Sequence, residues 1–327
     1  MPTPYRKLSL AETMGWTLAA PAQAWLTLRG DPSVPPSRFG PSSLRVFTPK
    51  LAIATWAGRR LHARSVPVFN LFNHTQTPVD DGWSVRVTQV RDFRGRTMSY
   101  DSHNGTDFAV VPGTRVVVSA PGRVVAIRSE YNRGGLKVYV DHGGGLLTTY
   151  NHLGRALCRV GDDVGRGDVI ALSAYSGVDA LISFPWVPPH IHYNTALGGV
   201  LVDPFAANGG TPLWRGEDGL PAPSRASDDD SAQARQFEPT RFDAAAVDRL
   251  LDDLRADDRR LALGRERDVA LRAWGLVIES ITYPTRFASP EAGRMVFDDC
   301  PRRTLLDLPV HREQADGIVF ADDVGLR

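Results

Sequence analysis

The sequence predicts a mostly β protein: an antiparallel sandwich or barrel-like sheet followed by a small α-helical region. Between residues 84 and 215, short runs rich in β-branched residues alternate with glycine turns. No apolar periodicity of helical length separates these runs, which argues against a parallel sheet built from βαβ units. Beyond residue 240 the apolar residues recur with a helical period instead. Short, regularly spaced strands are typical of sandwiches and barrels.

The expected strands are apolar runs bounded by turn signals. The clearest are residues 115–119, 123–127, 136–140 and 146–150. An Asn-Arg-Gly-Gly stretch lies between the second and third runs, and three consecutive glycines precede the fourth. Both stretches have the composition of hairpin loops, so we expect neighbouring strands to pair in an antiparallel manner.

Helical character begins after residue 240. Val247, Leu250, Leu251 and Leu254 follow the i, i+3, i+4, i+7 spacing of one helix face. Thr240 and Asp243 resemble a capping box at its start. A second helix is expected over residues 268–281, because a proline follows at 284.

Four segments are therefore expected: a mixed, loop-rich region at 1–83, a β domain at 84–215, a linker at 216–239 and a helical C-terminal region at 240–327. The linker contains Pro221, Pro223 and the acidic run 228–230. This composition favours a solvated tether over a metal or partner site.

Composition excludes several classes of protein. The chain has 327 residues, enough for about two domains. Its formal net charge of +1 gives no electrostatic case for nucleic-acid binding. Cys158 and Cys300 are too few for a disulfide scaffold or a cysteine-rich metal site, and they leave the redox compartment open.

No apolar run reaches the roughly 18 residues of a membrane span. The best candidate for a leader, residues 14–28, is interrupted by Pro21 and Gln23. An ordinary structural segment is therefore favoured over a cleaved signal. The oligomeric state is left open.

Three histidine patterns occur within the β region. His103 and Asp107 are four residues apart, both are good zinc ligands, and Gly105 between them would allow the backbone to bend. His190 and His192 are two apart, so on a strand they face the same way. Each of these patterns alone is a weak signal, because such residues are often unrelated and exposed.

The third pattern is Tyr150-Asn151-His152-Leu153, at the end of an expected strand. All three patterns together, in this order and within one β domain, are far more specific. This set resembles the lysostaphin-type, or LytM-like, family of zinc metalloendopeptidases, which cut peptidoglycan cross-bridges and have the duplicated hybrid motif fold. The resemblance covers residues 84–207, and it includes the stretch 117–125, the hairpin 140–145, the glycine-punctuated stretch 161–177 and the closing Asp-Pro at 203–204.

The resemblance implies a zinc ion held by His103, Asp107 and His192, with catalysis by His152 and His190. Three protein ligands leave one position for water, as catalytic zinc sites require. The two remaining histidines would transfer protons and stabilise the oxyanion. The sequence does not show which histidine has which role. The implied substrate is a peptidoglycan stem or cross-bridge peptide, and the implied location is the cell envelope or periplasm, with the cytoplasm not excluded by any clear signal.

Some interpretations stay open. Where the family usually has a second glycine, Ala174 and Tyr175 precede Ser176. The apolar loop 178–189 is either packed or one wall of a substrate groove. His142 is either structural or a supporting residue of the site. Three arginines at 91, 94 and 96 form either a solvated loop or a contact to an anionic substrate.

Two other functions compete with that of an endopeptidase. Some LytM-like proteins lack zinc ligands and instead bind and activate other cell-wall hydrolases. Here all five positions are filled, which favours an enzyme. The other rival, a group-carrying β domain such as a lipoyl or phosphocarrier domain, would need only one exposed lysine or histidine at a hairpin.

Overall fold

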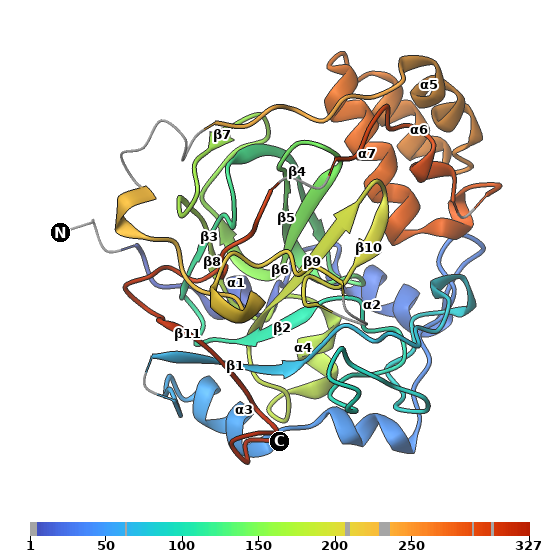
Figure 1. Ribbon diagram of the computed structural model, residues 1–327. Coiled ribbons are helices and arrows are strands. Elements are labelled where there is room, and N and C mark those ends of the chain that lie inside the picture. The colour runs from blue at the N-terminus through green and yellow to red at the C-terminus, as the bar shows by residue number, and fades with distance from the viewer. Residues whose placement is uncertain (1–4, 63, 207–209, 229–235, 290, 302–303) are drawn as a thin grey trace.

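The computed structural model describes residues 5–62, 64–206, 210–228, 236–289, 291–301 and 304–327. Within them, the strands form one 11-stranded sheet with the main order β11-β1-β2-β9-β6-β5-β4-β7 (Figure 1). The strands are β1 (Ser65–Asn70), β2 (Thr106–Ala109), β3 (Arg115–Val117), β4 (Gly122–Glu130), β5 (Gly135–Asp141), β6 (Leu146–Ala156), β7 (Asp163–Val164), β8 (Val169–Ser173), β9 (His190–Leu197), β10 (Val200–Val202) and β11 (Gly317–Phe320).

Helices precede β1, separate β8 from β9, and lie between β10 and β11 in the sequence. They are α1 (Leu10–Met14), α2 (Ala20–Arg29), α3 (Pro49–Trp56), α4 (Val178–Ser183), α5 (Ala244–Asp253), α6 (Asp257–Gly264) and α7 (Val269–Thr282). In Figure 1, α5, α6 and α7 gather at one end of the sheet, while α3 and α4 lie near the opposite end. Among the described residues, no helix has the length and apolar character needed to cross a lipid bilayer.

The predicted β-rich fold is confirmed. Strands β4, β5 and β6 pair antiparallel in succession, and both expected hairpin loops lie between them. The sandwich or barrel-like form is not confirmed, because the sheet does not close. It branches instead: the first half of β6 pairs with β9, whereas its second half pairs with β8, which also pairs with β3.

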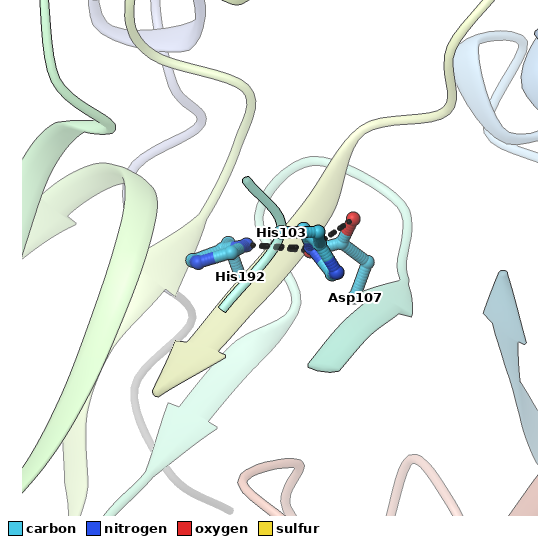
Figure 2. Close-up of side chains that lie close together, drawn as sticks. All are labelled: His103, Asp107 and His192. Atoms are coloured by element: carbon cyan, nitrogen blue, oxygen red, sulfur yellow. Dashed lines mark hydrogen bonds and ion pairs between the residues drawn. The ribbon is translucent and has the colours of Figure 1, made fainter. Parts of the chain in front are cut away.

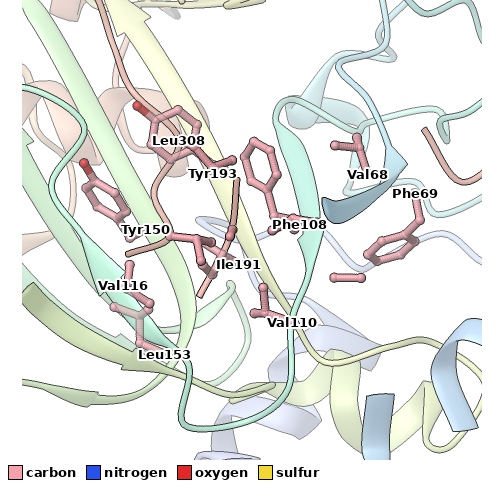
Figure 3. Packing of buried hydrophobic residues seen from close by; sticks show 14 of the residues in the cluster. Val68, Phe69, Phe108, Val110, Val116, Tyr150, Leu153, Ile191, Tyr193 and Leu308 are labelled. Atoms are coloured by element: carbon pink, nitrogen blue, oxygen red, sulfur yellow. The ribbon is translucent and has the colours of Figure 1, made fainter. Parts of the chain in front are cut away.

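One large core lies against the central strands (Figure 3). Phe108 of β2, Tyr150 of β6, and Ile191 and Tyr193 of β9 are fully buried there. The hydroxyl of Tyr150 accepts a hydrogen bond of 2.9 Å from the backbone N–H of Ser119, so its polar end is satisfied. This packing fixes β2, β6 and β9 relative to one another, and these strands supply most of the candidate site.

The C-terminal region packs on the opposite side of strands β4 to β6. Trp274 and Val277 of α7 form a second core with Val125, Tyr139 and Leu147 of the sheet. Helix α7 begins and ends within one residue of the predicted 268–281. The region also contributes β11, which pairs with β1 in parallel and was not predicted from the sequence. The sheet therefore includes strands from outside residues 84–215, while the domain boundaries themselves stay a prediction.

Two local predictions at the start of this region need correction. The Thr240–Asp243 capping box is wrong: Asp243 is itself the N-cap of α5, and its side chain accepts from the backbone N–H groups of Ala245 and Ala246. Thr240 instead donates its hydroxyl to the Asp141 carboxylate at 2.6 Å. In the acidic run 228–230, Asp228 pairs with an arginine at 2.6 Å, and the other two residues lie outside the described residues.

The arginines before the first histidine motif do not contact the site. Arg94 pairs with Asp92 at 3.0 Å and with Asp322 at 2.9 Å, and Arg96 also pairs with Asp322, at 3.3 Å. Arg91 is exposed. Two of the three arginines therefore tie the loop to the C-terminal end of the chain, a role that local sequence could not indicate.

A buried charge cluster joins α7 to the sheet. The Glu279 side chain is fully buried and pairs with Arg128 of β4 at 2.8 Å, and also with Arg259 and Arg286. Removing the carboxylate takes this anion away from Arg128 and Arg286, whose side chains are largely buried. We expect Glu279→Gln to lower the free energy of unfolding by about 3–5 kcal/mol, the usual cost of breaking a buried pair.

Chemical unfolding measures this change. The matched control is Glu291→Gln, which removes an exposed pair with Arg294 and should cost less than about 1 kcal/mol. Equal effects of the two substitutions would mean that the cluster does not hold α7 to the sheet.

Candidate metal centre and active-site groove

Strand register brings the site together. Across four neighbouring strands, Asn70 of β1 is paired with Asp107 of β2, Asp107 with His192 of β9, and His192 with Asn151 of β6. These residues form one row across the sheet. His190 lies two residues from His192, and side chains two apart on a strand face the same side.

The three predicted ligands converge on one point (Figure 2). His103 Nε2 lies 3.2 Å from His192 Nδ1 and 3.1 Å from Asp107 Oδ2. His192 Nδ1 lies 2.7 Å from Asp107 Oδ1. All three residues are buried. Ligand bonds of about 2.0–2.1 Å in a tetrahedron give ligand-to-ligand distances of roughly 3.3 Å, so this donor set could hold a metal ion after small shifts.

Outer contacts fix these side chains. His103 Nδ1 lies 2.7 Å from the carbonyl oxygen of Leu71, so an Nδ1–H donates a hydrogen bond there. The Nε2 atom is then unprotonated, and its lone pair is available to a metal ion. Asn70 donates to Asp107 Oδ2 at 2.9 Å. Asn194 Nδ2 lies 3.0 Å from His192 Nε2. Asn70 has no local sequence signal, whereas Asn194 could have been found by extending the alternation of His190 and His192.

The electrostatics favour a charged carboxylate among neutral imidazoles. Burial by itself raises the pKa of Asp107, but His103, His190 and His192 together bring that pKa well below its usual value. Burial lowers the pKa of His192, and it lowers the pKa of His190 to about 3. Neutral imidazoles and an ionised carboxylate are the forms that bind metals.

The two remaining histidines lie beside the trio. The rings of His152 and His190 are 4.7 Å apart, and the rings of His152 and His192 are 6.0 Å apart. His190 Nε2 lies 3.7 Å from Asp107 Oδ1. The structure thus brings together all five residues singled out from the sequence.

His152 has an unusual backbone. Its φ angle is 58°, in the left-handed region that non-glycine residues rarely adopt. The register between β5 and β6 also shifts here, where β6 leaves β9 and joins β8. Such bulges re-aim a side chain, and strained backbone clusters at functional sites. The backbone N–H of His152 donates to Gly134 O at 2.8 Å, and the Nδ1 of His152 lies 2.8 Å from Ser176 O.

Tyr175, at the departure from the family pattern, forms an aromatic wall of the site. Its ring lies 4.8 Å from that of His190 and 5.2 Å from that of His152. Its hydroxyl contacts Ser183 of α4 at 2.9 Å. Burial raises the pKa of Tyr175 well above its ordinary value, so the phenol stays neutral.

A groove of about 1020 Å³ runs past His152 and His192. One wall comes from α7, through Ile278 and Ile281, and another from α4, through Val178 and Ile182. The apolar segment 178–189 is therefore both a groove wall and a packed segment. Part of it lines the groove, while Phe184 packs edge-on against Trp56 with ring centroids 5.0 Å apart.

His142 is structural. Its Nδ1 lies 2.9 Å from Pro121 O and its Nε2 lies 2.8 Å from Thr148 Oγ1. Burial lowers its pKa to about 4, so it is neutral. Both ring nitrogens are thus engaged away from the metal-ligand trio, and His142 does not line the groove.

Gly105 is required for space rather than for bending. A Cβ at this position would lie 2.6 Å from Tyr193 O and 2.9 Å from His192 Nε2. We expect Gly105→Ala to displace β9 and to weaken metal binding by at least about tenfold, as loss of an outer contact does. A competitive zinc titration measures this. Gly317→Ala, where nothing lies within 4 Å, is the control. Unchanged affinity would contradict the steric role.

Comparison with known proteins agrees with this geometry. Residues 101–204 match peptidase family M23. The chain is 35% identical over 132 residues to the peptidoglycan DD-endopeptidase ShyA of Vibrio cholerae, covering 40% of this chain and 29% of that protein. It is 31% identical over 110 residues to the DD-carboxypeptidase/endopeptidase Mpg of Neisseria meningitidis, covering 34% and 24%. The matched part is thus under a third of either relative's length.

Among solved structures, the catalytic domain of lysostaphin from Staphylococcus simulans aligns at 26% identity with a TM-score of 0.28, covering 32% of this chain and 77% of that domain. The M23 match contains His103, Asp107, His152, His190 and His192. Residues 101–204 of this chain are therefore a domain of peptidase family M23.

Proposed function

We propose that this chain is a zinc-dependent endopeptidase that hydrolyses peptide bonds in peptidoglycan stems or cross-bridges. The observation that carries the proposal is the convergence of His103 Nε2, the Asp107 carboxylate and His192 Nδ1 on one point beside two further histidines. The relatives named for peptidoglycan endopeptidase activity support the substrate class. They also support a location in the cell envelope.

The donor set suits zinc. Two imidazole nitrogens and one carboxylate are the ligands of several catalytic zinc sites, and they leave a fourth position open. A zinc ion held there would act as a Lewis acid and lower the pKa of a bound water to about 7. The Leu71 carbonyl and the Asn70 amide would keep His103 and Asp107 oriented toward it.

His152 and His190 are the proposed proton-transfer groups. Each has its Nδ1 against a backbone carbonyl, Ser176 O or Pro188 O, at 2.8 Å. An Nδ1–H donated to those carbonyls leaves both Nε2 atoms free to accept a proton. Once protonated, either imidazole can donate to the developing oxyanion or to the leaving amine. Burial lowers the pKa of His190 to about 3, so that ring is neutral before reaction.

Zinc removal and return tests this proposal. The purified chain is stripped with a chelator, dialysed, and assayed for release of soluble fragments from purified peptidoglycan, with and without one equivalent of zinc. We expect activity to be lost on stripping and restored by zinc. A zinc-loaded protein that releases nothing would favour the rival function, a LytM-like module that activates other hydrolases.

A further inference from the structure

The groove contains a cation for which the structure provides no anion. Arg133 lies in the turn between β4 and β5 and lines the groove together with His152. The next residue, Gly134, accepts the hydrogen bond from the backbone N–H of His152. Arg133 is thus one residue from the contact that holds the strained backbone of a proposed catalytic histidine.

The Arg133 side chain lacks the partners that neighbouring cations have. Its Nε is buried and has no hydrogen-bond partner. Among the described residues, no carboxylate forms an ion pair with it. Lys137, the other cation lining the groove, is held by Glu130 at 2.5 Å. Arg133 as a whole is half-buried. A partly desolvated charge without a partner is unfavourable, so such a group is expected to have a ligand.

The groups around Arg133 leave it available. Trp83 lies under the guanidinium, with 5.8 Å from Cζ to the ring centroid. Glu130 is already occupied by Lys137 and by the hydroxyl of Tyr283 at 3.2 Å. Asp179 lies in the same groove and attracts Arg133 without pairing with it. Burial lowers the pKa of Arg133, although a guanidinium stays charged at neutral pH.

We propose that Arg133 binds a free carboxylate of the peptide substrate and so selects peptides that carry this group near the scissile bond. The inference rests on the function proposed above. A guanidinium is planar and presents paired N–H donors that match a carboxylate, and aromatic stacking pre-orients it. The rest of the groove near α7 is apolar, with Leu147, Ala196 and Ile278, and would accept uncharged parts of the substrate.

The test uses two synthetic stem-peptide dimers that differ only in one group: the terminal carboxylate is free in one and amidated in the other. With zinc-loaded wild type, we expect kcat/KM to be about ten- to hundredfold higher for the acid, the range of a hydrogen-bonded charge contact. In Arg133→Gln this ratio should fall to near one, and Arg133→Lys should retain part of it. An unchanged ratio in Arg133→Gln, or equal loss on both peptides, would overturn the proposal.

Two controls keep the outcome decisive. Arg123→Gln removes a cation of β4 that pairs with Asp163 and does not line the groove, and it should leave the ratio unchanged. If wild type cleaves neither dimer, the proposed function fails, and calorimetric binding of the same two dimers then decides this inference. Tighter binding of the acid than of the amide, lost in Arg133→Gln, would support the carboxylate site; equal binding would refute it.

Discussion

Replacing His192 by alanine is expected to abolish zinc binding and peptide hydrolysis together. The substitution removes one of three donor atoms, the Nδ1 that lies 2.7 Å from Asp107. Loss of an outer contact alone typically costs about 10–100-fold in metal affinity, so loss of a ligand should exceed about 100-fold. Elemental analysis of the purified variant should find almost no zinc, and fragment release should be undetectable.

A histidine outside the groove gives the matched control for this substitution. His62 belongs to no motif and lies outside the five-residue site. His62→Ala should retain one zinc per chain and wild-type activity. One zinc per chain in His192→Ala would contradict the assignment of this residue as a ligand.

Replacing His152 by alanine is expected to leave zinc binding intact and to remove most of the activity. His152 lies beside the ligands, with its ring 6.0 Å from that of His192, and it does not belong to the converging trio. Zinc content should therefore stay at one per chain. Loss of a positioned proton-transfer group typically costs about 10²–10⁴-fold in rate, which a peptide-hydrolysis assay resolves.

The backbone at His152 calls for a second variant. Because its φ is 58°, alanine adds strain, whereas asparagine tolerates left-handed backbone better. His152→Asn should therefore have a free energy of unfolding close to that of wild type, keep its zinc and be inactive. If both His152 variants lost zinc to the same extent as His192→Ala, the division into ligands and proton-transfer groups would be wrong.

The five residues singled out from the sequence lie together in the structure, and they could be found because their patterns are local. His103 with Asp107, and His190 with His192, are short-range pairs whose spacing limits how they can point. What the spacing could not reveal is the register that places Asn70, Asp107, His192 and Asn151 in one row across four strands. Register depends on contacts between distant segments, and a slip of one residue would turn each side chain to the other face.

The features missed from the sequence are also non-local. Strand β11 pairs in parallel with β1 although the two are separated by most of the chain. The Glu279 cluster joins α7 to β4. Helix α7 was predicted, but its position as a wall of the groove follows only from packing. The role of Gly105 was misjudged for the same reason, since the atoms that would clash with a Cβ belong to β9.

Mass analysis of peptidoglycan digested with the zinc-loaded protein tests the central claim most directly. We expect cross-linked peptide dimers to disappear and fragments to appear whose summed mass exceeds that of the dimer by one water, with the glycan chains intact. His152→Asn should leave the dimers uncut. Intact dimers after prolonged digestion with wild type, or cleavage confined to the glycan, would contradict the assignment of this chain as a peptidoglycan endopeptidase.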